Sequence, residues 1–187
     1  MTRDRYAFVK AVGTNAPGKQ VNGACGGATV VFEVDTPETQ AQKLAALARA
    51  ELSPTVATRY VGCNFVDESP WAKLEQAGFD RTKPFVCTWE GVTCYLPEHV
   101  VVDFLTRAGE VMAGNARACL VLDVILQDKH VELPLAAANA LEATGEPWLS
   151  FYPANFADYL QRRNVPLLVC DQVNLSRAGL VMLVPIT

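Results

Sequence analysis

The sequence predicts an α/β fold in which helices cover a mostly parallel sheet that ends in a C-terminal antiparallel hairpin. Short apolar runs rich in β-branched residues alternate with segments that carry helix-start signals. The apolar runs are almost continuously hydrophobic, which is typical of strands buried on both faces. Only NLSRAG (174–179) separates the last two runs, and this is too short for a helical crossover, so we expect those strands to pair antiparallel.

Six apolar runs are the predicted strands. Each is about the length of an ordinary strand, and polar or turn-forming residues bound each of them. Their ranges are 29–34, 58–64, 83–89, 117–126, 165–173 and 180–186.

Helix-start signals fall between these runs. Thr36, Pro37 and Glu38 combine a capping oxygen, a proline at the first helical position and an early acid. Ser69 and Pro70 repeat the pattern, and Gly78 is a plausible end for that helix. Five helices are therefore expected, beginning near residues 37, 70, 98, 133 and 153.

Length and composition limit the classes of protein to consider. The 187 residues predict one domain over 1–187, and 50 % of them are hydrophobic, which is enough for a sizeable core. The net charge is −4 and no basic block occurs, so we expect no nucleic-acid partner. No apolar run approaches the roughly 20 residues that span a bilayer, and the N-terminus lacks an apolar signal core. These features predict a cytoplasmic protein that does not enter the membrane.

The six cysteines are expected to be free thiols. Four of them, at 63, 87, 119 and 170, fall inside predicted strands, where a buried thiol packs as a small apolar group. No CxxC pair occurs and there are only two histidines, so the sequence predicts no metal site.

Polar side chains follow three predicted strands where each strand ends. Glu33 and Asp35 end the first, Asn64 and Phe65 follow the second, and Glu90 ends the third within WEGVTCYLP. Open α/β sheets bind ligands beyond the carboxyl ends of their strands, and a carboxylate there can accept both hydroxyls of a ribose. The alternative is that Asp35 only caps the next helix while Glu33 is solvated.

Four segments carry a resemblance to a known family. FEVDTPETQAQK, YVGCNF, KPFVCTWEGVTCYLP and PWLSFYPANFADYLQRRNVPLL, in this order, resemble the leucine carboxyl methyltransferase family. The resemblance extends from about Arg3 to the end of the chain. It implies a Rossmann-like class I methyltransferase sandwich and S-adenosylmethionine as cofactor. It also implies O-methylation of a carboxyl or hydroxyl group on a small molecule or peptide.

The resemblance also implies roles for single residues. Glu33 or Asp35 would bind the ribose, and both match acids of the family. Asn64 and Phe65 would frame the adenine, Glu90 would pair with the ammonium of the methionine part, and Tyr95 would look toward the substrate. A packed aromatic is the alternative for Tyr95. No catalytic base is predicted.

The chain departs from the family at the first motif. The family has a strand, a glycine-rich turn of the form GAGxDTR and a helix, whereas this chain has only QVNGACGGA, in which Gly23 and Gly26 are the expected cofactor contacts. The first strand is reduced to GKQVN (18–22) and the following helix is missing. RDRYAFVKAVG (3–13) would be all that remains of the family's N-terminal helical region. The alternative function is therefore a non-catalytic methyltransferase-like domain, a pseudoenzyme or truncated product, whose exposed apolar surface favours self-association.

Overall fold

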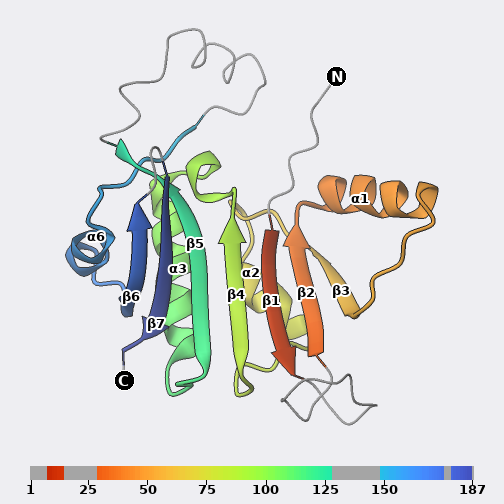
Figure 1. Ribbon diagram of the computed structural model, residues 1–187, viewed down its shortest axis with the longest axis horizontal. Helices are drawn as coiled ribbons and strands as arrows, with labels where there is room; N and C mark the ends of the chain where they lie inside the picture. Colours follow the sequence, from red (N-terminus) through yellow and green to blue (C-terminus); the bar gives the residue numbers. More distant parts are fainter. Residues whose placement is uncertain (1–7, 15–28, 128–147, 175–177, 187) are drawn as a thin grey trace, which may run out of the picture.

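The computed structural model describes residues 8–14, 29–127, 148–174 and 178–186, the first of these ranges by its backbone. One seven-stranded sheet runs through them in the order β3-β2-β1-β4-β5-β7-β6 (Figure 1). The strands are β1 (Phe8–Thr14), β2 (Thr29–Asp35), β3 (Ala57–Gly62), β4 (Phe85–Glu90), β5 (Ala118–Ile125), β6 (Leu167–Asn174) and β7 (Ala178–Pro185). The helices are α1 (Pro37–Arg49), α2 (Pro70–Gln76), α3 (Glu98–Met112) and α6 (Phe156–Arg162), with a 3-10 turn, η1, at Thr93–Tyr95.

The predicted α/β class is confirmed. β2 pairs parallel with β3, and β4 pairs parallel with β5. β7 pairs antiparallel with both β5 and β6, which is the expected C-terminal hairpin. Strands β2 to β6 therefore all point the same way, and only β1 and β7 run against them.

Strand β1 corrects the expectation for the N-terminal segment. Residues 8–14 are not the remnant of a helical region but an inner strand of the sheet, antiparallel to β2 on one side and to β4 on the other. The physical reason lies in the connection. Thr14 pairs with Thr29, so the chain leaves β1 and enters β2 at the same end of the sheet, as a hairpin does, whereas a parallel pair needs a long crossover. GKQVN, Gly23 and Gly26 lie in that connection, outside the described residues.

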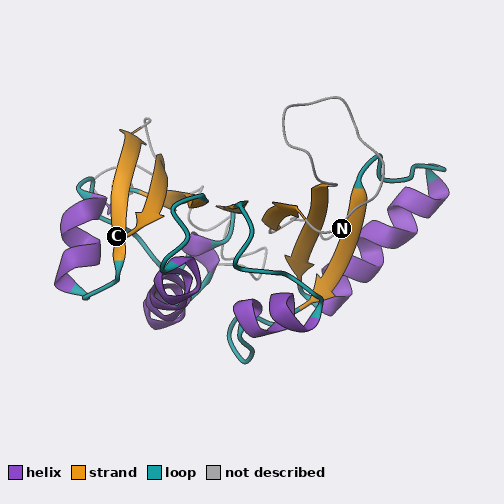
Figure 2. Ribbon diagram, turned by 90° about the horizontal axis from the view of Figure 1, so that it is seen from below, coloured by secondary structure: helices purple, strands orange, loops and turns teal. Residues whose placement is uncertain are grey.

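Helices pack mainly on one face of the sheet. Figure 2 shows α2, α3 and α6 on the same side, while α1 stands at the β2–β3 edge. The core between sheet and helices is aromatic: Trp89 stacks on Phe104 with ring centroids 3.8 Å apart, and Trp71 stacks on Phe104 at 5.2 Å. Side-chain caps begin three helices, with Thr36, Ser69 and Asn155 each accepting a backbone N–H. The helix predicted near residue 133 lies outside the described residues.

The other face of the sheet is largely uncovered among the described residues. Along β4 the pleat sends Phe85, Cys87 and Trp89 into the core, while Val86 and Glu90 point to the other face and are exposed. β5, β7 and the first half of β6 alternate in the same way. This uncovered side of β4, β5, β7 and β6 is called the open face below.

The cysteine expectation is confirmed in part. Cys63, Cys87 and Cys94 are buried free thiols, but Cys119 is only half-buried and Cys170 is exposed. The expectation of burial is wrong for Cys170 because it lies on the edge strand β6, at an irregularity in the pairing between Val169 and Asp171. Burial raises the pKa of the Cys119 thiol, and the nearby Cys170 raises it further.

Candidate functional site

Three carboxylates stand in one row across the carboxyl end of the sheet. Phe8 of β1 pairs with Glu90 of β4. On the other side of β1, Val9 pairs with Val34 of β2, so Phe8, one residue before Val9, lies level with Asp35, one residue after Val34. Asp123 follows directly after the Trp89–Leu122 pair, so it lies level with Glu90 on the neighbouring strand. Adjacent strands are about 4.8 Å apart, so Asp35 and Glu90, on either side of β1, are roughly 10 Å apart along this row.

The two acids of β2 have different surroundings. Both are buried, but the Glu33 carboxylate forms an ion pair with Lys43 of α1. Asp35 ends the strand, and its carboxylate accepts the backbone N–H of Thr36 at 2.7 Å. Gln40 of α1 donates to the Glu33 carbonyl at 2.9 Å, so α1 is attached to β2 by both a backbone and a side-chain contact.

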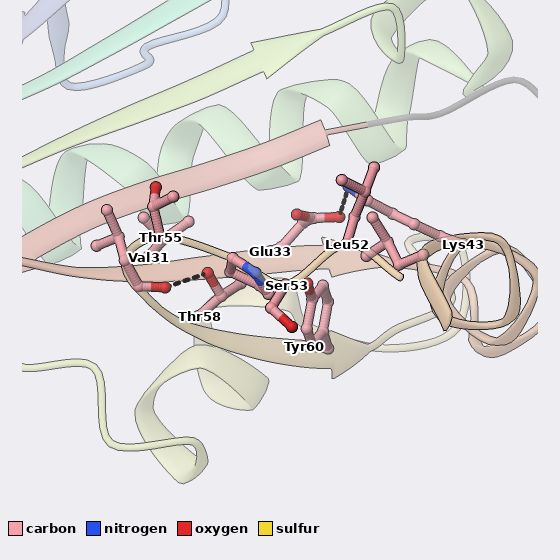
Figure 3. A pocket seen from close by; sticks show the side chains of 11 residues that line it. Val31, Glu33, Lys43, Leu52, Ser53, Thr55, Thr58 and Tyr60 are labelled. Atoms are coloured by element: carbon pink, nitrogen blue, oxygen red, sulfur yellow. Dashed lines mark hydrogen bonds and ion pairs between the residues drawn. The ribbon is translucent and has the colours of Figure 1, made fainter. Parts of the chain in front are cut away.

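The Glu33–Lys43 pair lies in a hollow of about 420 Å³ between α1, β2 and β3 (Figure 3). Its walls combine apolar groups such as Leu52 with the hydroxyl groups of Thr58 and Tyr60. Loss of solvation raises the pKa of Tyr60, and the negative charge of Glu33 raises it further. Glu33 therefore faces this hollow, with its charge already balanced by Lys43.

The turn after β4 is held by Asp123. Gly91 has φ +68°, a conformation that favours glycine, and its N–H donates to the Asp123 carboxylate at 2.8 Å. The hydroxyl of Thr93 donates to the Asp123 carbonyl at 2.7 Å. These two hydrogen bonds attach the residues on either side of Val92 to Asp123 of β5. They therefore fix the turn that directly follows Glu90.

The Asp123 carboxyl group has a raised pKa. Burial raises its pKa above the ordinary value, and the neighbouring Glu90 carboxylate raises it further, while the Gly91 hydrogen bond acts in the opposite direction. The N–H of Gly91 partly offsets the cost of the buried negative charge. The pair formed by Glu90 and Asp123 therefore concentrates negative charge at the end of β4.

The residues after β3 are mostly engaged with one another. The Asn64 amide donates to Asp67 at 2.6 Å, and its oxygen accepts the N–H of Val66 at 3.1 Å. The Phe65 ring is buried and stacks on Trp89 with centroids 6.3 Å apart. In this structure Phe65 packs in the core against Trp89 and also borders a hollow of about 280 Å³ that His99 and Asp103 line.

Tyr95 lies in η1, immediately after the Gly91 turn, and is half-buried. The segment that begins at residue 148 crosses this turn: Leu149 donates its N–H to the Cys94 carbonyl at 2.6 Å, and the Ser150 hydroxyl donates to the Leu96 carbonyl at 2.6 Å. The end of β4 is therefore supported from two sides, by β5 and by this later segment.

The sheet thus brings together Asp35 and Glu90 among the predicted site residues, and places Glu33 in a separate hollow. Two residues of the site were missed by reasoning from the sequence. Lys43 follows Glu33 by ten residues, a separation that becomes a contact only because α1 turns back over β2. Asp123 is the only charge in the strand ACLVLDVI, which was a signal that it has a specific partner.

Comparisons with known proteins point to one family. Residues 22–108 match the leucine carboxyl methyltransferase family. The resemblance is confirmed. A Mycobacterium avium protein is 38 % identical over 89 residues, and a Mycolicibacterium smegmatis protein is 30 % identical over 142 residues; both are S-adenosyl-L-methionine-dependent methyltransferases by name. The matches cover 48 % and 76 % of this chain but only 28 % and 44 % of those relatives, so the chain spans less than half of their length.

Solved structures share the fold. A DUF574 family protein from Streptomyces avermitilis superposes with a TM-score of 0.59 over 84 % of this chain and 65 % of that one, at 14 % identity. The O-methyltransferase NcsB1 from neocarzinostatin biosynthesis, in complex with S-adenosylmethionine and a naphthoic acid, gives a TM-score of 0.52 at 11 % identity, over 83 % of this chain and 41 % of its own. At these identities the likeness concerns the fold alone, which is the Rossmann-like class I methyltransferase fold. Across the described ranges of this chain, no helix is long and apolar enough to cross a membrane.

Proposed function

We propose that this chain is the cofactor-binding part of an S-adenosylmethionine-dependent O-methyltransferase. The observation that carries the proposal is the row at the carboxyl end of the sheet, where Asp35 and Glu90 stand level on either side of β1. The family match and the relatives' names supply the cofactor class. The naphthoic acid bound to the O-methyltransferase NcsB1 supports a small-molecule acceptor, and the family resemblance is the ground for a carboxyl or hydroxyl group on a small molecule or peptide.

The residues present at the ends of β2 and β4 fit this cofactor. S-adenosylmethionine supplies a methyl group on a positively charged sulfur, which an oxygen nucleophile can take by in-line displacement. Asp35 would accept hydrogen bonds from the ribose hydroxyls, because a carboxylate offers two acceptor oxygens. Glu90 would pair with the ammonium of the methionine part, a charge-assisted contact strengthened by the negative field of Asp123.

We assign the ribose to Asp35 rather than to Glu33. Asp35 lies level with Glu90 at the carboxyl end of the sheet, whereas Glu33 lies two residues back, beside Lys43 in the hollow of Figure 3. Asn64 and Phe65 are weaker candidates for the adenine than expected, since the amide and the ring already have partners within the chain. Gly91, with its positive φ, would let the backbone pass close to the cofactor.

Calorimetric titration with S-adenosylmethionine and with its demethylated product tests the proposal. The wild-type chain should release heat with both, and Asp35→Asn should bind more weakly by roughly tenfold, because it loses one acceptor oxygen and the charge. Glu33→Gln is the matched control: it removes an acid two residues away on the same strand and should leave affinity unchanged. Absence of heat from the wild type at millimolar ligand would refute cofactor binding, and loss of affinity only in Glu33→Gln would move the ribose to Glu33.

A second candidate function rests on the direction of β1. Because β1 runs antiparallel, the connection that contains the glycines at 23 and 26 is attached at the end of the sheet opposite the row of acids. This observation favours a non-catalytic methyltransferase-like domain. Transfer of labelled methyl from the cofactor to any acceptor in a cell extract would exclude it.

A further inference from the structure

We propose that Asp123 is a positioning residue for cofactor binding, which holds the turn after β4 and thereby sets where Glu90 meets the ammonium of S-adenosylmethionine. This inference rests on the proposed function and adds to it a residue of the neighbouring strand. Asp123 is the only charged residue of β5, and it lies level with Glu90 of β4. It would act through Glu90 and not by contact with the reacting atoms.

On the β5 side, the register of the two strands ends before Glu90 is reached. The last pair of β4 with β5 is Trp89 with Leu122, which lies one residue before Glu90 and Asp123. The regular pairing of β4 with β5 therefore does not fix the position of Glu90. Beyond this pair, the side chain and the carbonyl of Asp123 make the attachment between β5 and the turn.

Two hydrogen bonds make this attachment. The Asp123 carboxylate accepts the N–H of Gly91 at 2.8 Å, and the Asp123 carbonyl accepts the hydroxyl of Thr93 at 2.7 Å. Gly91 has φ +68°, so the chain changes direction directly after Glu90. Thr93 is 1 % exposed, so its hydrogen bond is shielded from water. Removal of the carboxylate would release the residue next to Glu90, while the bond at Thr93 would remain.

The far end of the turn is fixed independently of Asp123. Leu149 donates its N–H to the Cys94 carbonyl at 2.6 Å, and the Ser150 hydroxyl donates to the Leu96 carbonyl at 2.6 Å. The stretch whose position depends on Asp123 is therefore short, and it begins directly after β4. Binding groups need such support, because a side chain displaced by about 1 Å no longer has a productive geometry.

The stability of the fold does not explain a carboxylate at position 123. Burial and the neighbouring Glu90 carboxylate raise the pKa of Asp123, so the ionised group costs stability that a neutral group would not cost. An asparagine could accept the same N–H without this cost. The carboxylate adds strength, because a hydrogen bond to a charged acceptor is roughly twice as strong as a neutral one. Such a charge is expected where the geometry of the turn matters for binding.

Calorimetric titration of the whole chain with S-adenosylmethionine tests this role. Asp123→Ala removes the acceptor of the Gly91 N–H and should weaken binding about tenfold, within the range of coupling between residues in contact. Asp123→Asn keeps a neutral acceptor and should stay within about threefold of the wild type. Asp171→Ala is the matched control: it removes the same charge from β6, on the far side of β7, and should bind as the wild type does.

A double-mutant cycle with Glu90 separates positioning from a general loss of structure. In the Glu90→Gln background, Asp123→Ala should weaken binding by less than about twofold more, because the group that it positions has already lost its charge. Methylthioadenosine, which lacks the amino-acid end of the cofactor, should bind Asp123→Ala and the wild type equally well. Equal weakening of both ligands would identify a general loss of structure and overturn the positioning role.

The remaining results separate this role from the proposed function. No heat from the wild type with S-adenosylmethionine would overturn both. If Glu90→Gln binds more weakly than the wild type, an unchanged affinity in Asp123→Ala overturns the positioning role alone, and so does an equally large loss in the Glu90→Gln background. An unchanged affinity in Glu90→Gln removes Glu90 from the site, and the positioning role with it. If Asp123→Ala does not fold, Thr93→Val, which removes the other hydrogen bond, takes its place in the same cycle.

Discussion

The two faces of strand β4 show how the pleat separates stability from binding. Trp89 points to the covered face, is fully buried and stacks on Phe104. Its neighbours Thr88 and Glu90 point to the other face, where Thr88 is half-buried and Glu90 is exposed. Adjacent residues of β4 therefore have different energetic roles. Substitutions on the covered face should change the free energy of unfolding, whereas the substitution of Glu90 on the other face should change the affinity for the cofactor.

Trp89→Ala should give the largest effect. Removing a fully buried tryptophan leaves a cavity between β4 and α3, and the free energy of unfolding should fall by about 3–5 kcal/mol. Thr88→Ala, on the other face, should change it by less than about 0.5 kcal/mol. Urea denaturation of both variants measures this contrast. Equal losses would mean that the open face is as tightly packed as the core.

Glu90→Gln should act on the ligand and not on the fold. If Glu90 pairs with the cofactor ammonium, binding should weaken by about 1.5–3 kcal/mol, the range for hydrogen bonds to charged groups. The melting temperature without ligand should stay as in the wild type, because Glu90 is exposed in the free protein. Calorimetry and thermal unfolding at several cofactor concentrations separate the two quantities. A destabilised variant with an undiminished ligand-induced shift would remove Glu90 from the site.

Gly91→Ala, compared with Gly114→Ala, separates the effect of a turn on stability from its effect on cofactor binding. Gly91 has φ +68° and Gly114, which ends the turn after α3, has φ +74° with open space around it. Alanine at either position should lower the free energy of unfolding by about 1–2 kcal/mol because of the left-handed backbone. Only Gly91→Ala should also weaken cofactor binding. Equal affinity in both variants would show that the turn after β4 does not approach the ligand.

Asp123→Asn should give the smallest effect, visible as a change in pH dependence. The pKa of Asp123 is raised in the folded state, so its contribution to stability is fully present below the unfolded pKa of about 3.9 and is lost as the pH rises through the folded value. Asparagine keeps an acceptor for the Gly91 N–H and has no charge to bury. The variant should therefore gain stability relative to the wild type at pH 7, and this gain should shrink as the pH is lowered toward 4.

The control for this pH profile is Asp103→Asn. Asp103 lies on α3 with its side chain 69 % exposed, beside Arg107. Urea unfolding of this variant should follow the wild-type curve from pH 7 to pH 4. If the stability gain of Asp123→Asn does not depend on pH, its cause is packing and not the titration of the half-buried Asp123 carboxyl.

Much of the fold could be predicted because its signals are local. The apolar runs and the caps at Thr36, Ser69 and Asn155 each depend on a few neighbouring residues. The direction of β1 could not be predicted, because it depends on how the connection to β2 returns and on a pairing with β4 that lies far along the chain. At the site, the acids of β2 and β4 were visible in the sequence. The sequence does not show that Asp35 and Glu90 lie level across β1, because this depends on the strand register. It does not show the contacts of Lys43 and Asp123 either, because these depend on the helix direction and on the register.

Strand β1 has a mechanical consequence for the whole molecule. It is the only strand that pairs with both β2 and β4 in the described sheet, so every ladder hydrogen bond between the β3–β2 half and the β4–β6 half passes through its seven residues. If β1 separates, the backbone network divides into two smaller sheets, which the described residues still connect through the chain between β3 and β4 and through side-chain contacts such as Phe79 against Phe85. Amide hydrogens of β1 should therefore exchange with solvent only when the two halves of the sheet separate. Their exchange rate then reports the free energy of this separation.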